Sequence, residues 1–259
     1  GLVPNGAAAR RKLIRRAYFD LIGLPPSPEE VEQFVSDPDP QAWPKLIDRL
    51  LDSEHYGERW ARHWMDVARF AESHGYEQDY DRPHAYHYRD FLIQAFNADM
   101  PFDQFTIEQI AGDMLPHPTR DQLVATGFHR NTMLNEEGGI DPLEFRYYAM
   151  VDRVGTTATT WLGLTLACAQ CHTHKFDPIS IRDYYRFQAF FTKGQPVNVV
   201  LSGEGEAARE LVEERWRIFD TVHDRLVVAK RRQGVPDPIY IVPATVIRGM
   251  KPAEKKRFE

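Results

Sequence analysis

Apolar residues recur every three to four positions along most of this chain, which is the spacing of one face of an α-helix. The first such stripe consists of Leu13, Ile14, Ala17 and Leu21. Gly23 and the prolines that follow it end the stripe, because neither residue type continues a helix well. Similar stripes follow at residues 43–51, 60–71, 89–96, 105–114 and 184–191. The pattern predicts a mostly α fold, an irregular helical domain with long loops.

Two helix starts are marked by capping signals. Ser27 is followed by proline and by Glu30, and Asp141 is followed by proline and by Glu144. Each set has the spacing of a capping box with proline in the first turn. The second signal predicts a long helix that runs to Trp161. Residues 72–88 are polar and aromatic, and they indicate a loop across one face of the domain.

The end of the chain has a different character. Residues 194–205 indicate a linker, and residues 206–232 form a charged amphipathic pattern typical of a long helix. The β-branched residues between 239 and 247 favour a short β segment. We therefore predict a helical domain over 1–195. Residues 196–259 are expected to contain the linker, the amphipathic helix and the start of a following region.

Composition excludes several classes of partner. A net charge of -6 and a pI near 6.0 give no reason to expect nucleic acid or an anionic membrane. No apolar run approaches the roughly 20 residues that a membrane-spanning helix needs. The sequence as given begins Gly-Leu-Val-Pro, which does not resemble a signal peptide. A mature or trimmed exported chain would have the same start.

The chain has two cysteines, and they stand three positions apart. This spacing excludes a disulfide framework between distant segments. Together with the next residue they form Cys168-Ala169-Gln170-Cys171-His172, the C-x-x-C-H signature of covalent haem c attachment. The two thiols must lie about one helical turn apart to reach two vinyl groups of one haem. His172 is then expected to ligate the iron from one side.

Two other interpretations of the cysteine pair stay open. One is a local disulfide or redox pair, because C-x-x-C alone is the thioredoxin-type motif. The other is a zinc site that adds His172 and His174 to Cys168 and Cys171. The spacing of these histidines is too short for the usual arrangement, and there is no second cysteine pair. Covalent haem with its iron is the favoured interpretation.

The ligand on the other side of the iron has several candidates. His63 shares a helical face with Trp60 and Val67, so it is expected to point into the core. His129 is a second candidate, and methionines such as Met133 are further ones. An open sixth position is also compatible with the sequence.

Haem propionates are anionic and need cationic partners when buried. The candidates that flank the motif in sequence are Arg146, Arg153, Lys175 and Arg182. His174 is too close to His172 to reach the opposite face of the haem. It is expected to contact a propionate or to support the ligand.

The acidic, glycine-rich residues from Asn135 to Asp141 offer oxygen atoms that could bind calcium. They lack the alternating ligands of an EF-hand. The favoured interpretation is a tight turn before the capped helix.

Several stretches together carry a family resemblance. They are RAYFDLIGLPP from Arg16, WARHWMDVARF from Trp60, residues 135–146, TWLGLTLACAQCH from Thr160, and HKFDP from His174. Over about residues 10–195 the chain resembles the planctomycete cytochrome-like domain of otherwise unknown function. That domain is found in large exported proteins beside a small cytochrome c domain and a further uncharacterised domain. Relatives commonly carry an acidic residue at the position of Thr173, so this chain departs from the family pattern there.

The leading functional hypothesis is a c-type cytochrome module that transfers electrons within a larger exported protein, periplasmic or at the cell surface. Its partner would be a redox protein or an adjacent cytochrome domain of the same polypeptide. One alternative is a haem enzyme or small-ligand binder with an open sixth position, to which His129 or Arg130 could contribute. Another is a structural or interaction module without haem, in which Cys168 and Cys171 form a disulfide or bind another metal.

Overall fold

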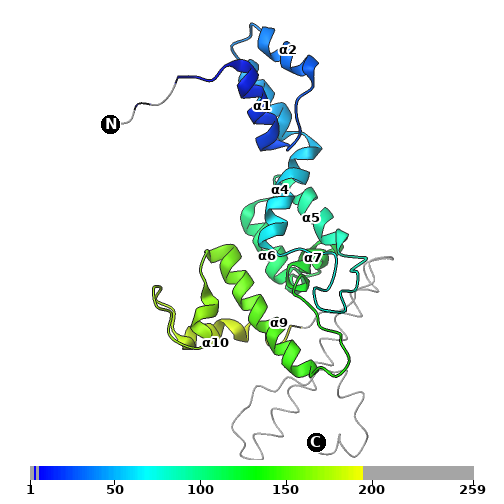
Figure 1. Ribbon diagram of the computed structural model, residues 1–259, viewed down its shortest axis with the longest axis vertical. Helices are drawn as coiled ribbons and strands as arrows, with labels where there is room; N and C mark the ends of the chain where they lie inside the picture. Colours follow the sequence, from blue (N-terminus) through cyan, green and yellow to red (C-terminus); the bar gives the residue numbers. More distant parts are fainter. Residues whose placement is uncertain (1–2, 4–5, 195–259) are drawn as a thin grey trace, which may run out of the picture. The chain divides into compact units, whose positions relative to one another are not determined.

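The computed structural model describes residue 3 and residues 6–194. This part is mostly helical and holds no β-strand beyond one isolated bridge between Ser73 and Asp81, which confirms the predicted fold class (Figure 1). The amphipathic helix and the β segment predicted after residue 195 lie outside the described residues. The chain divides into two compact units, Gly1–Leu115 with Asp121–Thr165, and Pro116–Arg120 with Leu166–Glu259. The predicted boundary at residue 195 stays a prediction.

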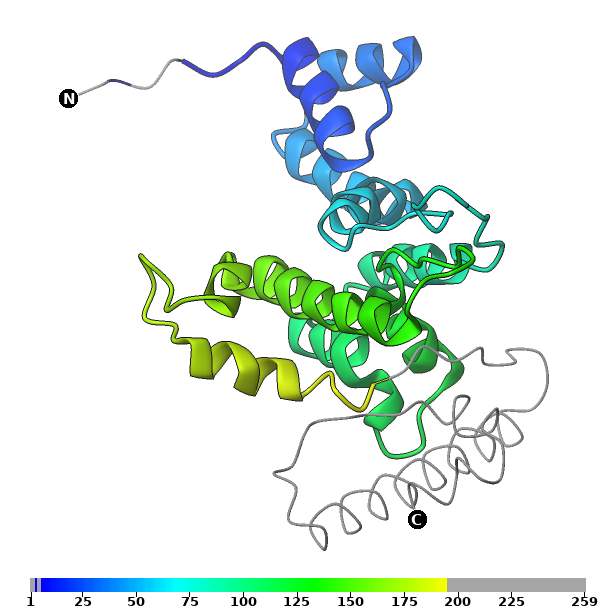
Figure 2. The ribbon, with the colours of Figure 1, turned by 60° about the horizontal axis from the view of Figure 1, so that its bottom comes forward.

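The first unit begins with three helices, α1 (Arg10–Leu21), α2 (Pro28–Ser36) and α3 (Ala42–Leu51). Figures 1 and 2 show α1 and α2 side by side. Their apolar faces form one cluster of buried residues, made of Ile14, Ala17, Tyr18, Phe34, Ala42, Leu46 and Leu50. The predicted capping box is present at the start of α2. The Ser27 hydroxyl accepts a hydrogen bond from the Glu30 amide at 3.2 Å, and the Glu30 carboxylate accepts one from the Ser27 amide at 2.8 Å.

Helices α4 (Glu54–Val67) and α5 (Tyr86–Asn97) pack closely against each other. The close approach occurs at Gly57, where an added Cβ would lie 2.4 Å from the carbonyl oxygen of Ile93. The Gly57 amide donates a hydrogen bond to the Asn97 side chain at 2.7 Å, which fastens the two helices at this point. Helix α5 begins three residues earlier than the apolar pattern predicts.

The buried face of α4 contains Gly57 and Ala61, and Ala68 follows at the end of the helix. Small residues occupy this face because α5 passes close to it. The prediction that His63 points into the core is wrong, because His63 is exposed and its neighbour on that face, Val67, is 43% exposed. The apolar stripe that contains Trp60 is offset from the buried face of α4 by about one residue position, because Trp60 directly precedes the buried Ala61.

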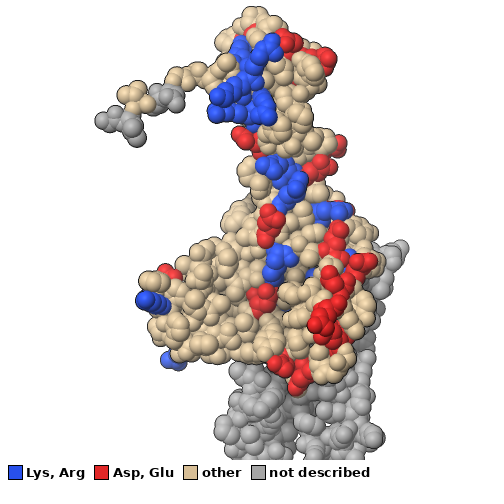
Figure 3. Space-filling view, viewed as in Figure 1, with Lys and Arg blue, Asp and Glu red and all other residues tan. Residues whose placement is uncertain are grey.

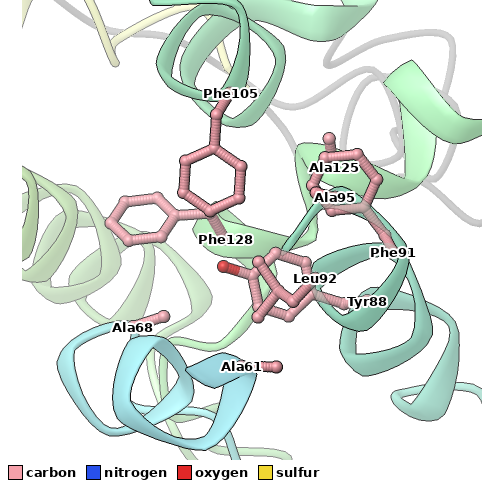
Figure 4. Close-up of a cluster of buried hydrophobic side chains, with 9 residues drawn as sticks. All are labelled: Ala61, Ala68, Tyr88, Phe91, Leu92, Ala95, Phe105, Ala125 and Phe128. Atoms are coloured by element: carbon pink, nitrogen blue, oxygen red, sulfur yellow. The ribbon is translucent and has the colours of Figure 1, made fainter. Parts of the chain in front are cut away.

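The main core of the first unit gathers residues from several helices, among them α6 (Phe102–Ala111) and the short helices α7 (Arg120–Ala125) and α8 (Gly127–Arg130). A 3₁₀ turn, η1 (Gly112–Met114), follows α6. Figure 4 shows the cluster, which consists of Ala61, Ala68, Tyr88, Phe91, Leu92, Ala95, Phe105, Ala125 and Phe128. Sequence patterns missed α7 and α8, because both are shorter than two turns.

One buried polar group is satisfied inside this core. The side-chain oxygen of Gln109 accepts hydrogen bonds from the Tyr88 hydroxyl at 2.7 Å and from the Trp64 indole at 2.8 Å. Its amide nitrogen donates to the carbonyl of Phe105 at 3.1 Å. Because Gln109 is fully buried, these bonds offset the cost of removing its amide from water.

Helix α9 (Pro142–Thr157) continues into a π-helical turn, η2 (Ala158–Leu162). Asp141 caps α9, since its carboxylate accepts the Leu143 amide at 2.8 Å. The Glu144 carboxylate accepts the Tyr148 hydroxyl of the same helix instead of completing the predicted capping box. Gly163 then ends η2 at a φ of 64°, a left-handed conformation that glycine adopts without a Cβ penalty.

The described part of the second unit contains η3 (Leu166–Gln170) and α10 (Ile181–Ala189), which contact each other. Ser180 and Asp183 form a capping box at the start of α10. The predicted buried helix at 184–191 is partly correct. Tyr184 and Phe191 are buried, whereas Phe190 is 80% exposed.

Charged residues are unevenly distributed on the surface. Figure 3 shows lysine and arginine gathered over α1, whose sequence contributes Arg10, Arg11, Lys12, Arg15 and Arg16. Among the described residues, no helix combines the length and the apolar character needed to cross a membrane.

Candidate functional site

The cysteine motif lies on the short helix η3 and the two residues after it. Residues three apart in a 3₁₀ helix lie one above the other. Leu166 and Ala169 form the buried row of this helix, whereas Cys168 and Cys171 are both exposed. Both cysteines are free thiols in the structure. The local fold therefore presents the two sulfur atoms to solvent from one segment and gives the apolar row to the interior.

His172 is exposed directly after the second cysteine. Its ring Nδ1 lies 2.8 Å from the carbonyl oxygen of Thr173. A carbonyl oxygen only accepts, so Nδ1 carries the hydrogen and Nε2 keeps the lone pair in the neutral ring. This is the tautomer that a histidine uses when Nε2 binds a metal.

His174 is buried and organises the loop that follows the motif. Its Nδ1 accepts the backbone amide of Asp177 at 2.9 Å, and the Asp177 carboxylate lies 3.1 Å from the same atom. The His174 amide also donates to the carbonyl of Ile179 at 2.8 Å. His174 thus shapes the loop between the motif and α10, and its predicted cofactor contact stays a prediction.

Tyr185 joins α10 to the motif. Its hydroxyl donates a hydrogen bond at 3.2 Å to the carbonyl of Gln170, the residue before Cys171. Tyr185 is 44% exposed, so this residue is open to solvent in part. No sequence pattern predicts this contact, because a tyrosine that bonds a distant backbone carbonyl leaves no signature in residue types.

Lys175 and Phe176 extend from the loop after the motif. The Lys175 ammonium lies 5.3 Å from the centre of the Phe176 ring, within the range of a cation–π contact. Phe176 is 84% exposed. A cation and an uncovered aromatic ring therefore lie within four residues of His172.

The zinc interpretation requires an assembled set of ligands. Within residues 6–194, no three or more histidine, cysteine or acidic side chains are gathered as a group that could bind a metal ion. Cys168, Cys171, His172 and His174 therefore do not form a four-ligand cage here. The predicted tight turn before α9 is present at Gly138 and Gly139. Just before it, the side-chain oxygen of Asn135 accepts the Glu137 amide at 2.9 Å.

The other candidate iron ligands and the candidate propionate partner Arg153 lie in the first unit. His129 donates from Nε2 to the carbonyl of Ile110 at 3.1 Å, and burial lowers the pKa of its ring to about 4. His129 is therefore neutral near pH 7. Arg153 is buried, and burial lowers the pKa of its guanidinium to about 10. Their roles toward a haem stay predictions, as does that of the exposed His63.

Comparisons with known proteins give one result. No curated protein and no solved structure matches the chain. Residues 1–195 match the model of the PSCyt2 family, described as a protein of unknown function (DUF1549). Since this match covers most of the chain, the protein belongs to the PSCyt2 family.

Proposed function

We propose that this protein carries one covalently attached haem c and acts as an electron-transfer module. The observation that carries the proposal is the presentation of the motif. Cys168 and Cys171 are free and exposed on one short helical segment, and His172 follows with Nε2 as its lone-pair nitrogen. These are the groups that thioether attachment and axial ligation require.

Neighbouring side chains fit the remaining needs of a haem. A porphyrin is broad and apolar, and the uncovered rings of Tyr185 and Phe176 could pack against it. Lys175 could pair with a propionate, because its ammonium is exposed three residues after His172. When bound, haem supplies a reversible one-electron couple. The side chains of this chain would hold the group, orient it and leave an edge accessible to a redox partner.

Covalent attachment suits a protein that works outside the cytoplasm, where a lost cofactor is not replaced. We therefore propose an exported location, periplasmic or at the cell surface. The redox partner would be a separate protein or an adjacent cytochrome domain of the same polypeptide.

The test is expression together with haem-maturation machinery, followed by visible spectra of the native protein and of pyridine-treated denatured protein. We expect a c-type haem signal that stays with the polypeptide after denaturation. The Cys168→Ser/Cys171→Ser variant leaves the chain without thiols and should lose the attached haem. His172→Ala should keep attachment but change the native spectrum by removing an axial ligand.

The matched control is His84→Ala, which removes an exposed histidine from a loop of the first unit. It should leave both spectra unchanged. A folded, helical protein that carries no haem from a competent host would refute the proposal. The cysteine pair would then be tested as a disulfide or a metal site.

A further inference from the structure

Three arginines of the first unit converge on one short stretch of backbone, residues 128–132. Arg69 donates to the carbonyl of Phe128 at 3.4 Å. Arg82 donates to the carbonyl of Thr132 at 2.6 Å and to that of Arg130 at 3.3 Å. Arg130 belongs to the stretch itself. Residues far apart in sequence thus bring three guanidinium groups to one place, which we call the arginine cluster (Arg69, Arg82 and Arg130).

Of the carboxylates that act on the arginine cluster, one forms a direct ion pair with it. Nε of Arg69 lies 3.1 and 3.0 Å from the two carboxylate oxygens of Asp152. Nη2 of Arg69 pairs with the same carboxylate. Asp79 and Glu136 also attract Arg82, and Glu136 attracts Arg130. Asp79 is exposed, and the Glu136 carboxylate is 53% exposed and lies 3.6 Å from His74. A further arginine of α9, Arg153, is repelled by Arg69 and Arg130 of the cluster. The local field is therefore positive.

Burial makes this positive field costly. Arg82 and Arg130 are half-buried, and removal from water lowers the pKa of each guanidinium below its usual range. The charges of Arg130 and Arg69 lower the pKa of Arg82 further. An anion at this place would replace the lost hydration and offset the repulsion.

Two donors of the arginine cluster lack an acceptor. Among the described residues, Nε of Arg82 and Nη1 of Arg130 are buried and have no hydrogen-bond partner. Buried polar groups are almost always paired, so each such nitrogen needs an explanation. A guanidinium nitrogen is matched best by the oxygen of a carboxylate, sulfate or phosphate.

We propose that the arginine cluster is a binding site for a small oxyanion, whose oxygens accept from Arg82 Nε and Arg130 Nη1. Both side chains are half-buried and their two unpaired nitrogens are covered from solvent, so a small anion would enter through a local movement of these side chains. The site differs from Arg11, Lys12, Arg15 and Arg16 of α1, which are exposed to solvent.

The test uses the Cys168→Ser/Cys171→Ser chain, which carries no attached haem, so its result is separate from that of the proposed function. Thermal unfolding and isothermal titration calorimetry would be measured with phosphate, sulfate and succinate against chloride at equal ionic strength. We expect saturable binding and a rise in Tm. Arg130→Gln should weaken binding at least tenfold and abolish most of the rise in Tm. It should also raise Tm in the absence of anion, because it removes a repelled charge.

Two further variants make the result specific. Arg62→Gln removes an exposed arginine of α4 and should keep full binding, which separates the site from the general stabilising effect of sulfate. Arg130→Lys keeps the charge but not the planar fork and should bind with intermediate affinity. No saturable binding, or equal binding by the parent, Arg130→Gln and Arg130→Lys chains, would overturn the proposal.

Discussion

The Tyr185 hydroxyl donates a hydrogen bond to the carbonyl oxygen of Gln170 at 3.2 Å. This bond ties α10 to η3 one residue before Cys171, so the orientation of the cysteine segment depends on a helix that begins ten residues later. A haem held by this segment would have Tyr185 as a neighbour.

Tyr185→Phe should loosen this connection and keep the ring. We expect a loss of about 0.5–1 kcal/mol of unfolding free energy, because a partly exposed hydrogen bond contributes little net stability. Chemical denaturation of the haem-free chain would measure it. Tyr148→Phe is the control, since the hydroxyl of that exposed tyrosine donates to Glu144 of the same helix, α9. An equal or larger effect of Tyr148→Phe would contradict a special role for Tyr185.

Asp152→Asn should destabilise the first unit by about 1–3 kcal/mol, because it removes the carboxylate that pairs with a partly buried arginine. The side chains of Arg69 and Asp152 are 24% and 34% exposed, so solvent screens the pair only in part. Glu32→Gln breaks the Arg11–Glu32 pair, which is 60% and 65% exposed, and should change stability little. Equal losses in urea titrations would show that burial does not matter here.

Acid should destabilise the protein through His129. Burial lowers the pKa of His129 from 6.5 to about 4 in the folded state, so the unfolded chain binds the proton first as pH falls. The contribution of the neutral, buried His129 to the unfolding free energy is complete above pH 6.5. It falls by about 3 kcal/mol in total as the pH drops from 6.5 to 4. His129→Gln keeps a donor toward Ile110 and should flatten the dependence of unfolding free energy on pH in this window. The exposed His84→Gln should leave it unchanged.

Gly57→Ala should force α4 and α5 apart, since the new methyl group would lie 2.4 Å from a backbone oxygen. We expect a loss of about 1–3 kcal/mol, the usual cost of overpacking. Gly138→Ala is the control because an added Cβ there meets nothing within 4 Å. A neutral result for Gly57→Ala in thermal unfolding would mean that the helices can move apart freely.

Local sequence was sufficient for the helical class, the cap at Ser27, the turn before α9 and the proximity of Cys168 to Cys171. These features depend on residues within one or two turns of each other, so spacing and residue type carry the information. Spacing also predicted an apolar stripe on α4, but it did not predict that α5 would pack on the neighbouring face.

Packing between distant segments decided which side chains are exposed and which distant groups they contact. His63 is exposed because α5 covers the face of small residues that contains Gly57 and Ala61. Tyr185 reaches Gln170, and Arg69 and Arg82 reach the backbone of residues 128–132, through contacts that no local pattern encodes. A side chain's neighbours across the fold depend on helix crossing and loop path, which arise only when the whole core is assembled.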